Sequence, residues 1–266
     1  MLDSTQEISS SSNQLIKLAS SLNEKKHRDS LGLFLVEGPK LILEALKAKF
    51  KLKNLFVLDN ALGEDIVPEL IINSISEDKI YRINSKLLKK ISNTENPNNL
   101  IAIFEKREAN TQIEFSALNL FCERIQDPGN LGAIVRSALA ANCTNIFCDE
   151  CADIYNPKVI RASAGSIFHA NIFTNSIQDL LKYKQEENLI FIATSPRAEL
   201  NYLELDLNMS NKHILMLGNE GQGLKQESFE KSNINIRIDI NPQVESLNAL
   251  AATTLLVFEM QRKLSI

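Results

Sequence analysis

The sequence lacks the segments that would place it in a membrane or in the secretory pathway. The longest uncharged stretch of the apolar C-terminal run, Ser246 to Phe258, is well short of the roughly 20 residues that span a bilayer. The N-terminal segment MLDSTQEISSSSNQ has neither the basic region nor the apolar region of a secretory signal. We therefore expect a cytoplasmic protein without a membrane partner, with an organelle as the alternative.

Cysteine is scarce, and its spacing does not complete a metal site. The four cysteines are Cys122, Cys143, Cys148 and Cys151, and the last two form a single CxxC pair. A tetrahedral zinc site needs a second such pair or a pair of histidines, and the sequence has neither in suitable spacing. We expect no metal, and reduced thiols in a reducing compartment.

Two further features are missing. No GxGxxG fingerprint is present: in GNEGQG, residues 218–223, the glycines fall at the first, fourth and sixth positions, which argues against an NAD enzyme.

An excess of positive charge is also missing, since the net charge is −4, and this argues against a general nucleic-acid binder. Residues 13–53 depart from this average, with nine basic residues against four acidic ones. Such a run is either a solvated face or a surface that binds phosphate.

The chain of 266 residues is long enough for two domains, and its pattern changes about two fifths of the way along. The first part predicts helices at 12–23, 39–46, 66–76 and 87–92, and strands at 33–38, 55–58 and 100–104. The polar stretch 105–112 carries no apolar period and indicates a boundary. We predict domains at residues 1–107 and 116–266, joined by a linker at 108–115.

The second part alternates strands and helices more strictly. Strands are predicted at 118–124, 145–148, 170–173, 189–193, 213–217 and 235–240, and helices at 131–141, 158–164, 177–184, 225–231 and from about 249 to the C-terminus. Continuous apolar strands that alternate with helices are typical of a parallel sheet covered on both faces. Ligands of such sheets bind at the carboxyl ends of the strands.

Three polar motifs lie at such ends: DPGNLGAIVRSA at 127–138, LMLGNEGQGL at 215–224 and VESLNALAATTLLVFEM at 244–260. In the first, we expect Asn130 to cap a helix whose buried stripe is Ile134, Val135, Ala138 and Leu139. Arg136 falls off that stripe. Without further context, Asn130 is equally well a simple cap and Arg136 a solvated side chain.

The second and third motifs have the same two possible readings. Gly218, Gly221 and Gly223 allow positive φ and a close backbone approach to a flat ligand, or simply a tight turn. Glu220 would otherwise be a surface carboxylate, while Ser246 and Asn248 would be helix caps.

In order and spacing the three motifs resemble those of the SpoU (TrmH-type) RNA ribose 2'-O-methyltransferases of the SPOUT superfamily. The resemblance covers about Leu120 to Met260 and extends more weakly to the N-terminal half. It implies S-adenosylmethionine as the cofactor. The cofactor contacts that it implies are Thr194, Gly218, Ile238, Ile240 and Leu247, and the catalytic residues are Asn130, Arg136, Glu220, Ser246 and Asn248.

The resemblance also implies a fold and partners. The C-terminal domain should be an α/β parallel-sheet trefoil-knot methyltransferase, homodimeric through its last helices. LFLVEGPKLILEAL, residues 33–46, looks like the small α/β domain, similar to ribosomal RNA-binding proteins, that precedes many family members. The RNA contacts would be Lys25, Lys26, Arg28, Lys158 and Arg161. Ribosomal RNA is favoured over tRNA as the substrate.

The implied reaction is an in-line methyl transfer from a sulfonium to a ribose 2'-hydroxyl, which needs no metal. Family proposals let Arg136 remove the proton, directly or through the RNA phosphate. Because the pKa of arginine exceeds about 12, we prefer Arg136 as a cation that binds the adjacent phosphate and stabilises the alkoxide. Asn130 and Asn248 would orient the ribose, Ser246 would add a hydrogen bond in the site, and Glu220 would hold an Asn or Arg in place.

One segment departs from the family, and two alternative activities stay open. Residues 238–242 read Ile-Asp-Ile-Asn-Pro, where the family usually has Ile-Pro-Met and then a Gly, and this affects the conformation of the loop. A non-catalytic RNA-binding or ribosome assembly factor could share the fold, although the polar set is intact. A base methyltransferase would need a carboxylate placed against a ring nitrogen.

Overall fold

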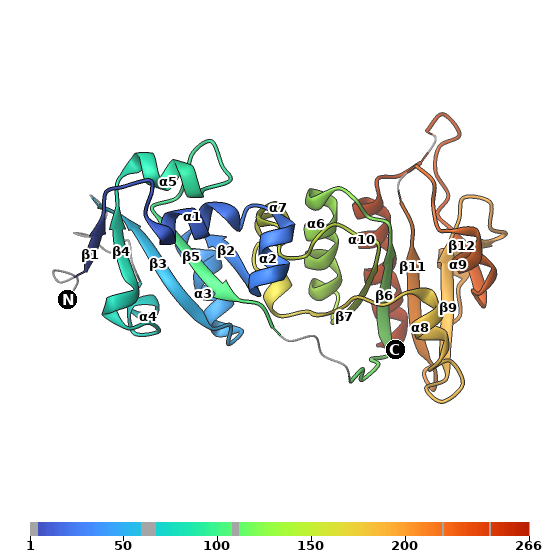
Figure 1. Ribbon diagram of the computed structural model, residues 1–266. Coiled ribbons are helices and arrows are strands. Elements are labelled where there is room, and N and C mark those ends of the chain that lie inside the picture. The colour runs from blue at the N-terminus through green and yellow to red at the C-terminus, as the bar shows by residue number, and fades with distance from the viewer. Residues whose placement is uncertain (1–4, 60–67, 108–111, 220, 245, 266) are drawn as a thin grey trace. The chain divides into compact units, whose positions relative to one another are not determined.

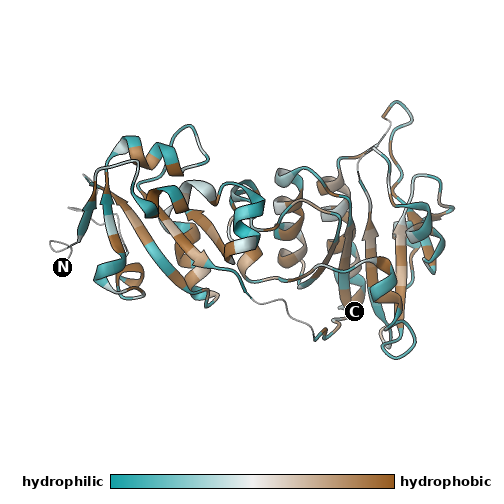
Figure 2. Ribbon diagram, in the orientation of Figure 1, coloured by the Kyte–Doolittle hydropathy of each residue, from teal (hydrophilic) through white to brown (hydrophobic). Residues whose placement is uncertain are grey.

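The computed structural model describes residues 5–59, 68–107, 112–219, 221–244 and 246–265, and these form two compact units. One unit comprises residues 1–108 together with 155–168, and the other comprises 109–154 and 169–266. Within the described residues no helix is long and apolar enough to cross a membrane. In both units the hydrophobic residues concentrate in the strands, while most loops are hydrophilic (Figure 2).

The first unit is a five-stranded mixed sheet with helices (Figure 1). Its elements are β1 (Gln6–Ile8), α1 (Gln14–Ser21), α2 (Lys25–Leu31), β2 (Leu33–Glu37), α3 (Pro39–Lys47), β3 (Leu52–Leu58), α4 (Glu69–Ile72), η2 (Glu77–Lys79), β4 (Ile80–Ile83), α5 (Ser85–Ile91) and β5 (Leu100–Glu105). The strand order is β1-β4-β3-β5-β2, with β5 antiparallel to both of its neighbours. Phe56, Ile101 and Ile103 lie in the core that α1 and α5 cover.

Among these elements, β1, α2, η2 and β4 were not predicted. Helix α2 forms within the basic run 13–53, where Arg28 is buried and donates to Leu22 O at 2.8 Å and to Asn23 O at 2.9 Å. Strand β4 is too short to give a clear pattern, and it forms because it pairs between β1 and β3. The helix predicted at 66–76 lies partly outside the described residues, and α4 covers four residues of it.

A segment distant in sequence completes the first unit. Residues 155–168 contain α7 (Pro157–Ala162) and η3 (Ser166–Phe168) and pack against β2. The Phe34 ring lies 4.7 Å from Tyr155 and 6.2 Å from Phe168, between centroids. Gly165 is required here, because φ is +90° and a Cβ would lie 2.9 Å from the side chain of Glu44.

The second unit is the parallel sheet that we predicted. Its elements are β6 (Leu118–Glu123), α6 (Pro128–Ala140), β7 (Asn145–Asp149), β8 (Asn171–Phe173), α8 (Ile177–Leu181), β9 (Leu189–Thr194), β10 (Leu200–Asn201), η4 (Tyr202–Glu204), β11 (Lys212–Leu217), α9 (Gln226–Glu230), β12 (Ile234–Arg237) and α10 (Ala249–Leu264). The order is β10-β12-β9-β11-β6-β7-β8, and all neighbouring strands in it pair in parallel.

Register and helix packing fix this sheet. Phe121, Phe147 and Phe173 lie side by side on β6, β7 and β8, and the last two rings stack with centroids 5.1 Å apart. Helices α6 and α10 pack together, and Thr254 Oγ1 donates to Ser137 Oγ at 2.9 Å. The strand predicted at 235–240 ends earlier, at Arg237, so the two isoleucines beyond it lie in a loop.

Candidate active site at the carboxyl ends of the parallel strands

Four adjacent strands bring the predicted motifs to one edge of the sheet. Strands β12, β9, β11 and β6 are consecutive neighbours and all parallel, so their carboxyl ends meet at the same edge. Thr194 is the last residue of β9, Gly218 follows β11 and Ile238 follows β12. The first motif follows β6. All five sequence-predicted cofactor residues therefore lie at the ends of these strands or in the loops that follow them.

The loop after β11 is closed by its own backbone. Asn219 N donates to Gly223 O at 3.1 Å, and Gly223 N donates to Asn219 O at 2.8 Å. Gly218 lies so close to the returning chain that a Cβ would be 2.0 Å from the carbonyl carbon of Gly223. Gly223 has positive φ, at +68°, and a Cβ on Gly221 would make an ordinary contact with Asn219 Oδ1 at 3.6 Å. Gly218 is therefore required because the loop's own backbone passes close to it, as in a tight turn, and its approach to a flat ligand stays a prediction.

The first motif is capped by a different residue from the one predicted. Helix α6 begins at Pro128, and its cap is Asp127, whose carboxylate accepts from Asn130 N at 2.8 Å. Asn130 is thus the third residue of the helix and not its cap, because the Asp-Pro pair starts the helix three residues earlier than expected. Arg136 is exposed, on the side away from the buried Ile134 and Val135. Leu139, predicted as buried, is half-buried.

The third motif starts α10. Asn248 is the N-cap, and its Oδ1 accepts from Leu250 N at 2.9 Å. Ser246 and Leu247 precede it and are exposed, so Asn248 is the one of the two predicted caps that forms. Glu220 lies outside the described residues.

The departure at 238–242 has its own anchor. Asp239 accepts from Arg237 Nε at 2.7 Å and from Asn201 Nδ2 at 2.6 Å. These bonds, that from Arg237 above all, lower the pKa of the Asp239 carboxyl. Asp239 thus ties the exit of β12 to neighbouring β10, and Ile238 and Ile240 on either side are half-buried.

This edge suits a flat, partly apolar cofactor such as S-adenosylmethionine. The Gly218 loop lets backbone approach closely, while Ile238, Ile240 and Leu247 offer apolar surface. The Thr194 hydroxyl donates to Met216 O at 3.1 Å and so ties β9 to β11 beneath the loop. Within the part of the chain that the structure describes, no group of three His, Cys, Asp or Glu side chains could hold a metal ion.

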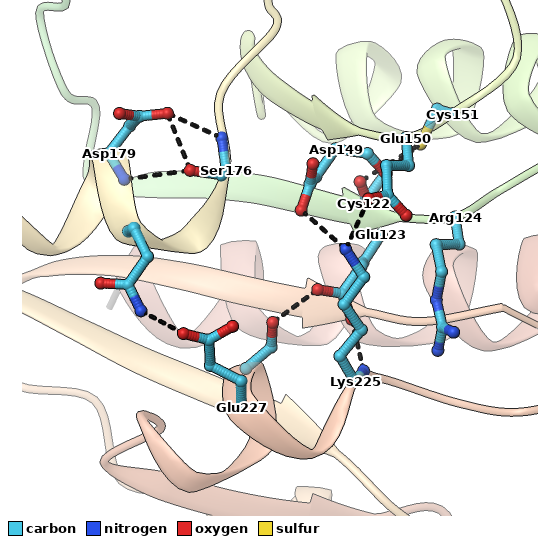
Figure 3. Close-up of polar contacts among 12 residues, drawn as sticks. Cys122, Glu123, Arg124, Asp149, Glu150, Cys151, Ser176, Asp179, Lys225 and Glu227 are labelled. Atoms are coloured by element: carbon cyan, nitrogen blue, oxygen red, sulfur yellow. Dashed lines mark hydrogen bonds and ion pairs between the residues drawn. The ribbon is translucent and has the colours of Figure 1, made fainter.

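The sequence did not single out the residues that hold this loop from below. Glu123, fully buried at the end of β6, accepts from Lys225 N and from Ser228 Oγ, each at 2.5 Å (Figure 3). Lys225 Nζ lies 3.0 Å from Glu150 and 3.5 Å from Asp149. The sequence did offer one sign of their role, because two consecutive charged residues, Glu123 and Arg124, follow directly on an apolar run.

The cysteines near this edge are thiols. Cys151 Sγ donates to Cys122 O at 3.2 Å, and a hydrogen bond with Cys148 lowers the pKa of Cys151. Burial raises the pKa of Cys143 to about 12.

The predicted RNA contacts lie in the first unit. Lys25 and Lys26 are exposed on α2, and Lys158 is exposed near the start of α7. The prediction for Arg28 is wrong, because its side chain is 2% exposed and serves the backbone at the end of α1. Arg161 is half-buried beside Glu37 and Asn23 in a small pocket, and its Nη1 has no hydrogen-bond partner among the described residues.

Comparison with known proteins gives two family matches and several relatives. Residues 117–258 match the SpoU rRNA Methylase family, and residues 13–102 match the MRM3-like substrate binding domain. The chain is 29% identical to RlmP of Bacillus subtilis, a 23S rRNA (guanosine(2553)-2'-O)-methyltransferase, over 96% of this chain and 99% of that protein.

Two solved structures are similar over nearly the whole chain. A crystal structure of an RNA 2'-O ribose methyltransferase has 31% identity and a TM-score of 0.84, covering 98% of this chain and 100% of the other. An AdoMet-bound rRNA methyltransferase from Sinorhizobium meliloti has 28% identity and a TM-score of 0.84, covering 98% of both chains.

Proposed function

The chain belongs to the SpoU rRNA methylase family, and on that premise we propose that it methylates a ribose 2'-hydroxyl of ribosomal RNA with S-adenosylmethionine. The observation that carries the proposal is the meeting of all three motifs at one sheet edge, around a loop that only Gly218 allows to close. Ribosomal RNA is favoured over tRNA because RlmP, similar over its whole length, acts on 23S rRNA. The MRM3-like substrate binding domain supports the same choice.

Thr194, Gly218, Ile238, Ile240 and Leu247 would hold the cofactor. S-adenosylmethionine supplies a methyl group already activated by its sulfonium. The protein must then align the ribose hydroxyl, and positioning alone can lower a barrier by about 7–11 kcal/mol.

Arg136 would supply the main electrostatic help. Its side chain is exposed on α6, and among the described residues it has no hydrogen bond or ion pair that would occupy the guanidinium. Because arginine keeps its proton, Arg136 would bind the phosphate next to the target ribose and stabilise negative charge on the 2'-oxygen.

The remaining polar residues would orient the ribose. Asn248 uses its Oδ1 for the cap of α10, which leaves its Nδ2 as a donor. Asn130 would orient the hydroxyl from the first turn of α6, and Ser246 would add a hydrogen bond. Glu220 would hold an Asn or Arg of this set.

The first unit would bind the RNA substrate. We propose domains at 1–107 and 116–266 with a linker at 108–115. Lys25 and Lys26 are exposed and would contact the RNA backbone, which carries affinity rather than sequence information. Lys158 and Arg161 would contact the substrate as well.

We further propose a cytoplasmic homodimer. Helix α10 leaves Leu255 and Phe258 39% and 48% exposed, although Leu256 and Val257 between them are buried. An apolar face of this kind fits a second copy of the chain.

The substrate class can be tested with methyl-labelled S-adenosylmethionine and undermodified total RNA. Large-subunit rRNA, small-subunit rRNA and tRNA are separated after incubation with the purified protein. The proposal predicts label in one ribosomal RNA species. Label only in tRNA would overturn the choice of substrate, and cofactor binding without label in any pool would favour a non-catalytic RNA-binding factor.

A further inference from the structure

The loop between β11 and α9 is held by a side chain that belongs to no motif of the family resemblance. Arg124 is the first residue after β6, and its φ of 59° is in the left-handed region, which residues other than glycine rarely adopt. Such a conformation persists only where surrounding contacts fix it, and it is often found beside functional sites.

The contacts of Arg124 explain this conformation. Its carbonyl accepts from Asn219 Nδ2 at 3.2 Å, while Nη1 donates to Gln222 Oε1 at 3.0 Å and Nη2 donates to Gly223 O at 3.2 Å. Its amide donates to Asp149 O at 2.8 Å. Backbone and guanidinium of one residue therefore contact the loop at three points.

Asn219 carries this constraint into the loop. Its Oδ1 accepts from Gly221 N at 2.9 Å and from Gln222 N at 3.2 Å, while its own backbone pairs with Gly223. The neighbour of Arg124, the buried Glu123, accepts from Lys225 N, where α9 begins. Consecutive residues at the end of β6 thus fix the middle of the loop and its far end.

We propose that Arg124 is a positioning residue for S-adenosylmethionine, which holds the loop 218–223 in the shape that receives the cofactor. This inference rests on the proposed function. The bonds that Arg124 makes to Gln222 and Gly223 are exposed and add little to global stability. Their effect is instead on the fraction of molecules whose loop has the binding shape, and the apparent Kd rises as that fraction falls.

The test measures cofactor binding to the full-length protein by calorimetry without RNA. If Arg124→Ala leaves the loop in the binding shape about a tenth of the time, the Kd for S-adenosylmethionine rises about tenfold. Arg124→Lys, which keeps a cation but not two separate donor nitrogens, should lie between this variant and wild type. Lys182→Ala removes an exposed cation at the C-cap of α8 that pairs with Asp179, and it should bind the cofactor like wild type.

A double-mutant cycle with Gln222→Ala distinguishes positioning from general destabilisation. The effects of Arg124→Ala and Gln222→Ala on the Kd should not add, because the two residues share one hydrogen bond. Without cofactor, amide exchange at 221–224 should speed up in Arg124→Ala, while the amides of β11 keep their protection. In steady-state methylation the KM for S-adenosylmethionine should rise, while kcat, reached at saturating cofactor, stays nearly constant.

The outcomes separate this inference from the proposed function. Unchanged cofactor affinity in Arg124→Ala, with wild type binding normally, would overturn the positioning role alone. Additive effects in the cycle, or equal loss of protection in the loop and β11, would overturn it as well. A wild-type protein that does not bind S-adenosylmethionine would overturn the proposed function and this inference with it.

Discussion

Arg136 is the residue on which the proposed chemistry depends most. Replacing it by Lys keeps the charge but loses the planar fork that matches phosphate. We predict that Arg136→Lys lowers kcat about 10²–10³-fold, the usual effect of removing one donor from a developing oxyanion, while the Kd for S-adenosylmethionine is unchanged. Single-turnover methyl transfer and calorimetry measure the two quantities. A near-normal rate in this variant would refute the role of Arg136.

His213 makes the stability of the second unit depend on pH. It is buried on β11, and burial lowers its pKa, although a contact with Ala117 O acts in the opposite direction. In the unfolded chain a histidine titrates near pH 6.5. As the pH falls from about 6.5 through the lower folded pKa, the unfolded state binds more protons, so the free energy of unfolding decreases. Above about pH 6.5 this contribution is fully present.

We therefore predict that the exchange protection of β11 amides falls between pH 7.5 and 5.5, after correction for the intrinsic exchange rate. In His213→Gln, which cannot take up a proton, this fall should be smaller. His27→Gln changes a partly exposed histidine of the first unit and should leave the fall unchanged. The same fall in His213→Gln as in wild type would contradict the prediction.

At this scale, sequence identified types of residue better than their partners. Arg28 is a basic residue of the kind that contacts RNA, but its buried guanidinium donates to backbone carbonyls at the end of α1. This burial depends on how α1 and α2 pack, which the sequence does not show. Asn130 was expected as a cap because Asn is a good one, but Asp127 precedes a Pro and caps first. Arg124 had no motif at all, and its role depends on a loop 95 or more residues away.

Among the elements, the loop after β11 is the most sensitive to a single atom. A Cβ on Gly218 would lie 2.0 Å from backbone, whereas a Cβ on Gly221 would have Asn219 Oδ1 at 3.6 Å as its nearest neighbour. A backbone shift that costs about 1.4 kcal/mol or more is enough to weaken binding by about tenfold or more. We predict this loss of S-adenosylmethionine affinity for Gly218→Ala, with Gly221→Ala as the matched control close to wild type. Equal affinities for the two variants, measured by calorimetry, would contradict the proposed loop geometry.

Most of the element order of the second unit followed from the sequence, because strands such as β6, β9 and β11 are mainly apolar runs, but the two-residue β10 (Leu200–Asn201) was not predicted. The ends of the strands did not follow from the sequence. Strand β12 stops at Arg237, and Asp239 just beyond it is bonded to Asn201 of β10. The alternating isoleucines of this segment give no sign of that end. The attachment of 155–168 to the first unit also could not be predicted, because it depends on aromatic contacts across more than 100 residues.

For the whole molecule, RNA binding should depend on charge in the first unit. Lys25 and Lys26 are exposed on α2, and each phosphate contact with a single strand contributes about 0.7 to the slope of log K against log salt. We predict that Lys25→Ala with Lys26→Ala lowers the slope by about 1.4. Lys86→Ala with Lys89→Ala on α5 removes the same charge and should leave the slope unchanged. Filter binding over a salt series measures both, and identical slopes for the two double variants would contradict the assignment.

The proposed homodimer depends on the exposed face of α10. Because Phe258 would be buried in it, Phe258→Asp should leave a monomer by light scattering at micromolar concentration, with the sheet still folded by circular dichroism. Glu230→Lys, an exposed charge change on α9, is the control and should keep the dimer. A dimeric Phe258→Asp variant would place the interface elsewhere.

Ribose 2'-O-methylation is tested most directly by finding where on the nucleotide the methyl group is attached. RNA labelled by the purified protein is hydrolysed with alkali, which needs a free 2'-hydroxyl to cleave the chain. Methyl transfer to the ribose 2'-oxygen predicts that the label is recovered in an alkali-resistant dinucleotide, and as a 2'-O-methylnucleoside after complete enzymatic digestion. Label on a mononucleotide with a methylated base would contradict it.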